Sequence, residues 1–149
     1  MLFNFRKISA GLTFAAIAAT LLFQTSILWA AQHGPLRITF HKCVREDGNY
    51  EGTWTGDLGA GDIVFLFESA VPGEVIWKFS GYYIIRLPDS TTITIHAAGI
   101  DNLRSGGGHD VLSGEVVDGY YSGAQVQVRA QDTDNGACAE GTITITPSN

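Results

Sequence analysis

The sequence predicts an all-β protein. An antiparallel closed barrel of eight strands is the favoured architecture, and a β-sandwich is the alternative. From Pro35 onward no segment has a helical period of useful length, whereas apolar and polar residues alternate with period two. Short turns rich in Gly, Asp, Asn and Pro separate about eight such runs, which is typical of barrels and sandwiches. Pairing of the last run with the first would close the sheet and remove its edges.

The first three runs differ in how their apolar residues are placed. Leu36 to Val44 and Tyr50 to Thr55 alternate like half-buried strands, and the charged turn Arg45 to Asn49 separates them. Asp62 to Glu68 is apolar on both faces. One face of that strand should meet the core and the other should be covered, for example by a partner subunit.

The middle of the domain continues the alternation. Glu74 to Leu87 has the pattern of a strand before and after Gly81. The glycine inside this pattern predicts a bulge or sharp bend. Thr91 to His96 has the threonine and β-branched bias of a strand with one solvated face. The Gly-rich stretch Arg104 to His109 is followed by a strand and not by a helix, so a flexible hairpin tip is favoured over a phosphate site.

The last three strands complete the predicted barrel. Asp110 to Val117 and Val126 to Arg129 flank the turn Gly119 to Gly123, and the second of these runs has the cleanest period-two pattern of the chain. Gly141 to Thr146 is the expected closing strand.

Residues 1–30 have the pattern of a secretory signal peptide. Arg6 and Lys7 form a basic start, a long apolar run follows, and Ala30 and Ala31 offer small residues for cleavage. A retained membrane anchor is the competing interpretation, because the run is long enough to span a bilayer at about 20 residues. Cleavage is favoured, and it predicts a secreted or periplasmic protein with no membrane association after the signal is removed.

Residues 31–149 are expected to form a single β-barrel domain. Their length of about 118 residues suits one hydrophobic core. They contain seven Lys and Arg against fifteen Asp and Glu, a net charge of −8. Such a surface repels phosphate backbones, so nucleic acid is not expected as a partner.

Both cysteines, Cys43 and Cys138, lie in this domain, one near each end. In an oxidising compartment the expected outcome is a disulfide. A redox-active pair would need a close spacing such as Cys-x-x-Cys, which the chain lacks.

Four short segments resemble those of small secreted barrel proteins of the allene oxide cyclase and dirigent families, which are calycin-like. They are Gly52 to Gly56, Thr94 to Asp101, Gly119 to Ala124 and Gly141 to Ile145. The resemblance implies an eight-stranded antiparallel barrel with a hydrophobic cavity, often in an oligomer. No catalytic residue of those families is carried over to a position of this chain.

An eight-stranded barrel is just wide enough to be filled by side chains or to hold one small ligand. Simple packing of the interior by aromatic rings is the first interpretation, and a pocket for a small apolar ligand is the second. The candidate ligand-binding residues are Phe65, Phe67, Trp77, Phe79 and Tyr83, with Glu68, Arg86 and His96 as polar groups to orient a guest.

Other chemistry has little support in the sequence. His96, Asp101, His109 and Asp110 gather within a short stretch, but hairpin surface is favoured over a metal site. Asp132, Asp134 and Glu140 do not have the spacing of a calcium loop. No metal and no cofactor is therefore predicted.

Three functions remain open. The first is a secreted or periplasmic binding module without catalysis. The second is an enzyme like the cyclases or dirigent proteins, which would steer a reactive apolar intermediate in the cavity. The third is a surface protein that works by assembly, for which a homo-oligomer would be the active form.

Overall fold

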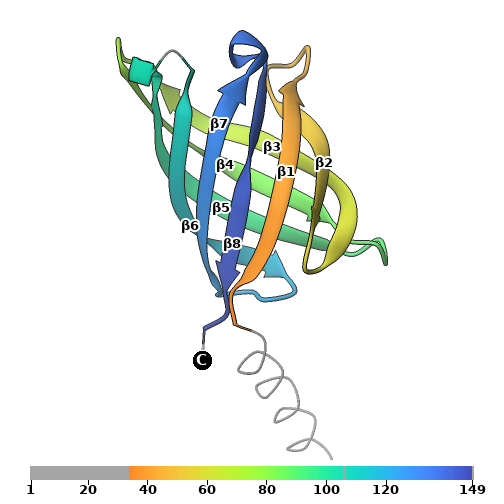
Figure 1. Ribbon diagram of the computed structural model, residues 1–149. Helices are drawn as coiled ribbons and strands as arrows, with labels where there is room; N and C mark the ends of the chain where they lie inside the picture. Colours follow the sequence, from red (N-terminus) through yellow and green to blue (C-terminus); the bar gives the residue numbers. More distant parts are fainter. Residues whose placement is uncertain (1–33, 106, 149) are drawn as a thin grey trace, which may run out of the picture. The chain divides into compact units, whose positions relative to one another are not determined.

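The strands of the computed structural model form one closed barrel, and the structure describes residues 34–105 and 107–148. Each strand pairs antiparallel with its sequence neighbour, and β1 pairs with β8 (Figure 1). The eight strands are β1 (Leu36–Val44), β2 (Tyr50–Gly56), β3 (Gly59–Val71), β4 (Ile76–Arg86), β5 (Thr92–Asn102), β6 (His109–Gly119), β7 (Gln125–Thr133) and β8 (Cys138–Thr146). The predicted closed barrel is confirmed, and the sandwich alternative is excluded.

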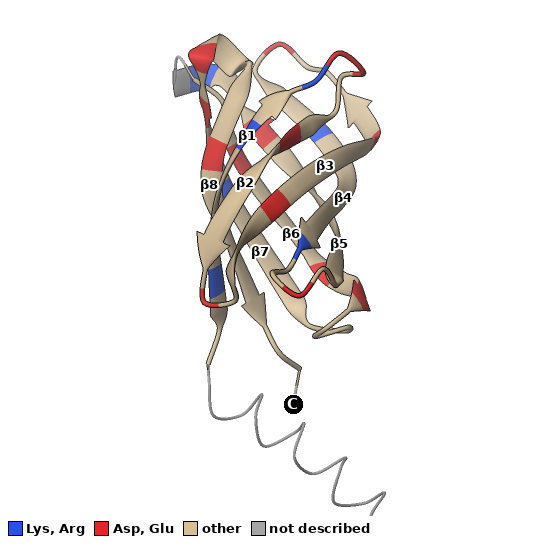
Figure 2. Ribbon diagram, turned by 90° about the vertical axis from the view of Figure 1, so that its right-hand side faces the viewer, with Lys and Arg blue, Asp and Glu red and all other residues tan. Residues whose placement is uncertain are grey.

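Residues Pro35–Ser148 form one compact unit. The signal peptide predicted for residues 1–30 lies outside the described residues. Within the described part of the chain, no helix is long and apolar enough to cross a bilayer. Acidic residues are spread over strands and turns of the barrel, with few basic residues between them (Figure 2).

The period-two pattern of the sequence determines which side chains enter the barrel. In β1, Leu36, Ile38 and Phe40 are buried and the residues between them are exposed. In β8, Ile143 and Ile145 are fully buried in the same way. Because alternate residues of a strand point to opposite faces, one stripe per strand fills the interior.

The sequence predicts a bulge or sharp bend at Gly81, and the irregularity found here lies in the strand paired with it. β4 runs through Gly81 without interruption, whereas the register of β3 shifts between Phe67, which is opposite Gly81, and Ser69, which is opposite Ser80. A Cβ atom on Gly81 would collide with the backbone carbonyl oxygen of Leu66 and would lie 2.6 Å from Cζ of Phe65. The close approach of the neighbouring strand and of the Phe65 ring therefore explains the glycine.

The two ends of the barrel differ. One end carries the β1–β2 turn and the short helices η1 (Leu103–Ser105) and η2 (Asp134–Gly136); we call it the η end (Figure 1). The opposite end carries the β6–β7 turn. Near that end Trp54 is buried, and its Nε1 donates a hydrogen bond of 3.0 Å to the carbonyl of Arg86.

The Cys43–Cys138 disulfide is present and joins the first strand to the last. The two cysteines are directly opposite in the β1–β8 register. Cys43 follows Lys42, whose side chain is buried inside the barrel, so the disulfide lies on the outer side of the sheet. The bond therefore locks the seam at which the sheet closes.

Replacing both cysteines by alanine should lower the free energy of unfolding by about 4 kcal/mol, because the bond spans 95 residues and restricts the unfolded chain. Urea denaturation at equilibrium measures the change. A double alanine variant of Thr39 and Thr142, the outward pair on the same two strands, is the matched control and should change stability far less. A loss below about 1 kcal/mol for the cysteine variant would contradict a stabilising role.

Candidate ligand-binding site

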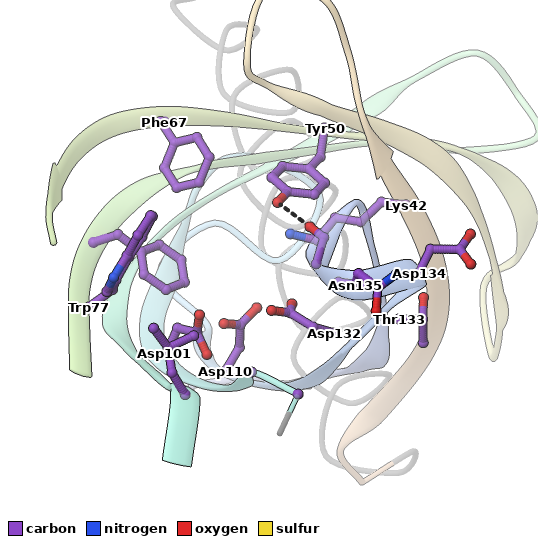
Figure 3. Close-up of a pocket in the computed structure, with 16 residues that line it drawn as sticks. Lys42, Tyr50, Phe67, Trp77, Asp101, Asp110, Asp132, Thr133, Asp134 and Asn135 are labelled. Carbon is purple, nitrogen blue, oxygen red and sulfur yellow. Dashed lines mark hydrogen bonds between the residues drawn. The ribbon is translucent and has the colours of Figure 1, made fainter. Parts of the chain in front are cut away.

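A cavity of about 640 Å³ occupies the η end of the barrel. One wall is apolar and is made by Phe67, Trp77 and Phe79. The side next to this wall is polar, since Asp101 is paired with Trp77 in the β4–β5 register, and Figure 3 shows three aspartates in a row facing Tyr50 across the cavity. The volume falls within the range of about 300 to 1,000 Å³ that is usual for small-molecule sites.

Lys42 lies inside the barrel because it continues the inward stripe of β1 after Phe40. Only 3% of its surface is exposed, and its side chain lines the cavity. Its Nζ is 4.4 Å from the ring centroid of Tyr50, 4.5 Å from that of Phe65 and 5.3 Å from that of Tyr83. Among the described residues, no carboxylate oxygen lies within 4.0 Å of this nitrogen.

Burial decides the protonation of this amine. Loss of water around the ammonium lowers the pKa of Lys42 from 10.5 to about 8, and the charges of Asp110 and Asp132 partly oppose the shift. The surrounding ring faces also favour the ammonium form, by about 0.5 to 2 kcal/mol in typical cation–π contacts. The amine is therefore held close to the point at which it can lose its proton at neutral pH.

The three aspartates come from three adjacent strands at the η end. Asp101 and Asp110 are partners in the β5–β6 register, and Asp132 is at the end of β7. Asp110 is 7% exposed. Burial raises the pKa of its carboxyl from 3.8 to about 7, Lys42 opposes the shift, and Asp101 and Asp132 add to it. Burial also raises the pKa values of Asp101 and Asp132.

Gly108 allows two of these carboxylates to lie close together. A Cβ atom at this position would collide with carboxylate oxygens of both Asp101 and Asp132. The carbonyl of Gly108 also accepts a hydrogen bond of 2.8 Å from the backbone N–H of Asp132. The glycine thus ties the chain before β6 to the end of β7 and leaves the acidic side of the cavity open.

Several polar atoms at this end are buried without a hydrogen-bond partner among the described residues. They are the hydroxyl of Tyr83, Oδ1 of Asp101 and Oγ1 of Thr133. Burial raises the pKa of Tyr83, so its hydroxyl stays protonated and can donate. Buried polar groups are normally paired, and two of these three, in Asp101 and Thr133, belong to residues that line the cavity. Tyr83 is fully buried and is not among the lining residues.

The structure brings the five aromatic candidates to this region. Phe67, Trp77 and Phe79 line the cavity, whereas Phe65 and Tyr83 are fully buried outside its lining and have their rings near the Lys42 amine. The Phe65 and Tyr83 rings themselves are 4.6 Å apart between centroids. The aromatic residues therefore serve both predicted roles, some as packing and some as pocket wall.

The three polar candidates are elsewhere, on the outer face of the barrel. His96 Nε2 lies 2.9 Å from Oε2 of Glu68, and Ser80 donates a hydrogen bond to the same oxygen at 2.9 Å. Arg86 is exposed, next to the buried Ile85 of the same strand. Each of the three occupies an outward position of its strand, so none of them can orient a ligand inside the barrel.

Sequence reasoning missed Lys42 and Asp132 as cavity residues and considered Asp101 and Asp110 only as metal ligands. The alternation along each strand could have identified these residues, because each occupies an inward position of its strand near the η end. Lys42 follows Phe40 by two residues, and Asp132 follows the buried Ala130 by two. Extending the period-two stripe into polar residues would have located all of them.

One group of potential metal ligands occurs among the described residues, outside the cavity. His41, Cys43 and Cys138 have ligand atoms within 4.8 Å of one another. The two sulfurs are joined in the disulfide, and His41 Nδ1 is 3.1 Å from Oε1 of Glu140. A thiolate is the form that binds a metal, so the oxidised pair is not a metal site.

Comparison of the chain with protein-family models, with curated proteins and with solved structures gave no match.

Replacing Asp110 by asparagine should change how stability depends on pH. The folded protein holds the Asp110 proton more tightly than the unfolded chain, so the contribution of this group is complete below pH 3.8 and is lost as the pH rises through about 7. The free energy of unfolding of the wild type should fall over this interval by a few kcal/mol more than that of D110N.

Urea denaturation at several pH values between 4 and 8 measures the difference. D118N, which removes an exposed carboxylate, controls for the change in net charge. Parallel pH profiles of the wild type and D110N would show that Asp110 is not protonated by burial.

Proposed function

We propose that this chain is an exported β-barrel binding module that holds one small, mainly apolar molecule at its η end. The observation that carries the proposal is the cavity itself, which has one aromatic wall and a polar side on which Oδ1 of Asp101 and Oγ1 of Thr133 have no hydrogen-bond partner among the described residues. Elsewhere in the barrel, inward-pointing Ile, Val and aromatic residues form the packed core. A site of this composition is the usual design of a small-molecule pocket.

The two sides of the cavity suggest what the ligand looks like. Phe67, Trp77 and Phe79 would bury the apolar body of the ligand, preferably one with a ring. Lys42 and Asp110 would meet its polar end, because they are the most buried ionisable groups of the cavity lining. The ligand should therefore be amphipathic, with its polar group directed into the barrel.

Export is part of the proposal. It rests on the signal-peptide pattern of residues 1–30 and on the disulfide, which is compatible with an oxidising compartment outside the cytosol.

An enzyme of the cyclase or dirigent kind is the second candidate. The observation in its favour is that Lys42 and Asp110 have pKa values of about 8 and 7 and border the same cavity. Groups that titrate near neutrality are suited to acid–base catalysis. A molecule that copurifies with the exported protein would separate the two proposals: on incubation, a binding module returns it unchanged and an enzyme converts it.

A neutral aromatic alcohol such as cinnamyl alcohol should bind saturably and change the tryptophan fluorescence. Residues 31–149 contain two tryptophans, Trp77 in the cavity wall at 43% exposure and Trp54 in the core. The change should persist in W54F and disappear in W77F.

A blocking variant tests where the alcohol binds. Ala139 is a buried residue of the cavity lining, and A139F would fill part of the space. Its affinity for the alcohol should be at least about tenfold lower than that of the wild type, which corresponds to 1.4 kcal/mol. Equal affinity in A139F, or a fluorescence change that does not saturate, would overturn the binding proposal.

A further inference from the structure

We infer that the polar end of the ligand is an aldehyde or ketone, and that Nζ of Lys42 condenses with it to form an imine. The inference rests on the proposed function, because the carbonyl compound must first enter the cavity at the η end. It adds a covalent step and a chemical class of ligand to that function.

The geometry around Lys42 is that of a reactive amine and not of a structural ion pair. Buried lysines are rare and are normally paired with a carboxylate. Here the nitrogen borders a cavity, and within 4.0 Å of it none of the described residues places a carboxylate oxygen. The nitrogen lies near the rings of Tyr50, Phe65 and Tyr83. These rings do not form an ion pair with the ammonium as a carboxylate would.

Imine formation needs the neutral amine. With a pKa of about 8, roughly a tenth of Lys42 is neutral at pH 7, several hundred times more than for a lysine at 10.5. Burial in an apolar site is a general means of producing nucleophilic lysines.

The condensation can be balanced with groups of the cavity. The nitrogen lone pair forms a bond to the carbonyl carbon, the C=O π electrons move to oxygen, and one proton passes from the attacking nitrogen to that oxygen to give a neutral carbinolamine. Protonated Asp110 then gives its proton to this hydroxyl, the C–O bond breaks, and water leaves. The products are a protonated imine on Lys42, an Asp110 carboxylate and one water molecule, so atoms and charge balance.

The cavity suits this product. The protonated imine would keep the positive charge of the ammonium between the ring faces, and the carboxylates of Asp110 and Asp132 would act as its counter-charges. The apolar remainder of the ligand would lie along Phe67, Trp77 and Phe79. Because Lys42 is only 3% exposed, access of bulk water for hydrolysis would be restricted.

The test uses the intact exported protein, cinnamaldehyde and sodium cyanoborohydride, which reduces an imine to a stable amine. The expected result is one added cinnamyl group per chain, mapped to Lys42 by peptide mass spectrometry. Residues 31–149 contain one other lysine, the exposed Lys78 of β4, which serves as an internal control. Labelling of Lys42 should exceed that of Lys78 at least tenfold.

Variants and a competitor make the experiment specific. K78R should keep the adduct, K42R should lose it, and excess cinnamyl alcohol should protect Lys42 by occupying the cavity. Site mapping in the wild type needs no variant, so it stands even where K42R fails to fold.

Two failures can be told apart. A saturable fluorescence change with cinnamyl alcohol, without preferential labelling of Lys42 by cinnamaldehyde, would overturn the imine and leave the binding module. Absence of both alcohol binding and labelling would overturn the binding module together with the imine.

Discussion

The pairing of β1 with β8 is the contact on which the rest of the structure depends. It closes the sheet, and its register sets Cys43 opposite Cys138 and Lys42 opposite Ala139. Because neighbouring residues point to opposite faces, the disulfide lies outside and the lysine lies inside. The seam that is locked by a covalent bond thus also positions the amine, next to an alanine small enough to leave space for the cavity.

Closure and cavity have opposite effects on stability. An open cavity and a buried ammonium both cost free energy, the second by desolvation that the charges of Asp110 and Asp132 only partly offset. The disulfide and the filled opposite end, around Trp54 and the inward isoleucines, act in the other direction. The η end can carry unpaired polar groups because the remainder of the barrel is well packed.

The fold could be predicted further than the site. Period-two alternation in β1 and β7, the turn residues between runs and the two cysteines were sufficient for a closed barrel with a disulfide. The site depends on which residues of several strands point inward. A bulge shifts the alternation of inward and outward residues by one position, so this cannot be counted along the sequence past a bulge. The shift of register between Phe67 and Ser69 is such a place, and Glu68 within it lies on the outer face with His96.

The polar cavity residues escaped prediction for a different reason. A lysine or aspartate at a strand end is ordinarily a solvated residue, so composition alone does not distinguish Lys42 or Asp132 from surface charges. Their burial results from the curvature of a closed barrel, which brings the ends of β1, β5, β6 and β7 around one cavity. Only the three-dimensional closure makes four separate strand ends into one site.

The account as a whole rests on the Lys42 amine being buried beside the cavity and close to neutrality. A side-chain NMR titration of isotope-labelled lysine, with the Lys42 signal assigned by its absence in K42R, measures this directly. The structure predicts a titration midpoint near pH 8. A midpoint at or above the ordinary value of 10.5 would show a solvated or firmly paired ammonium and would contradict the account.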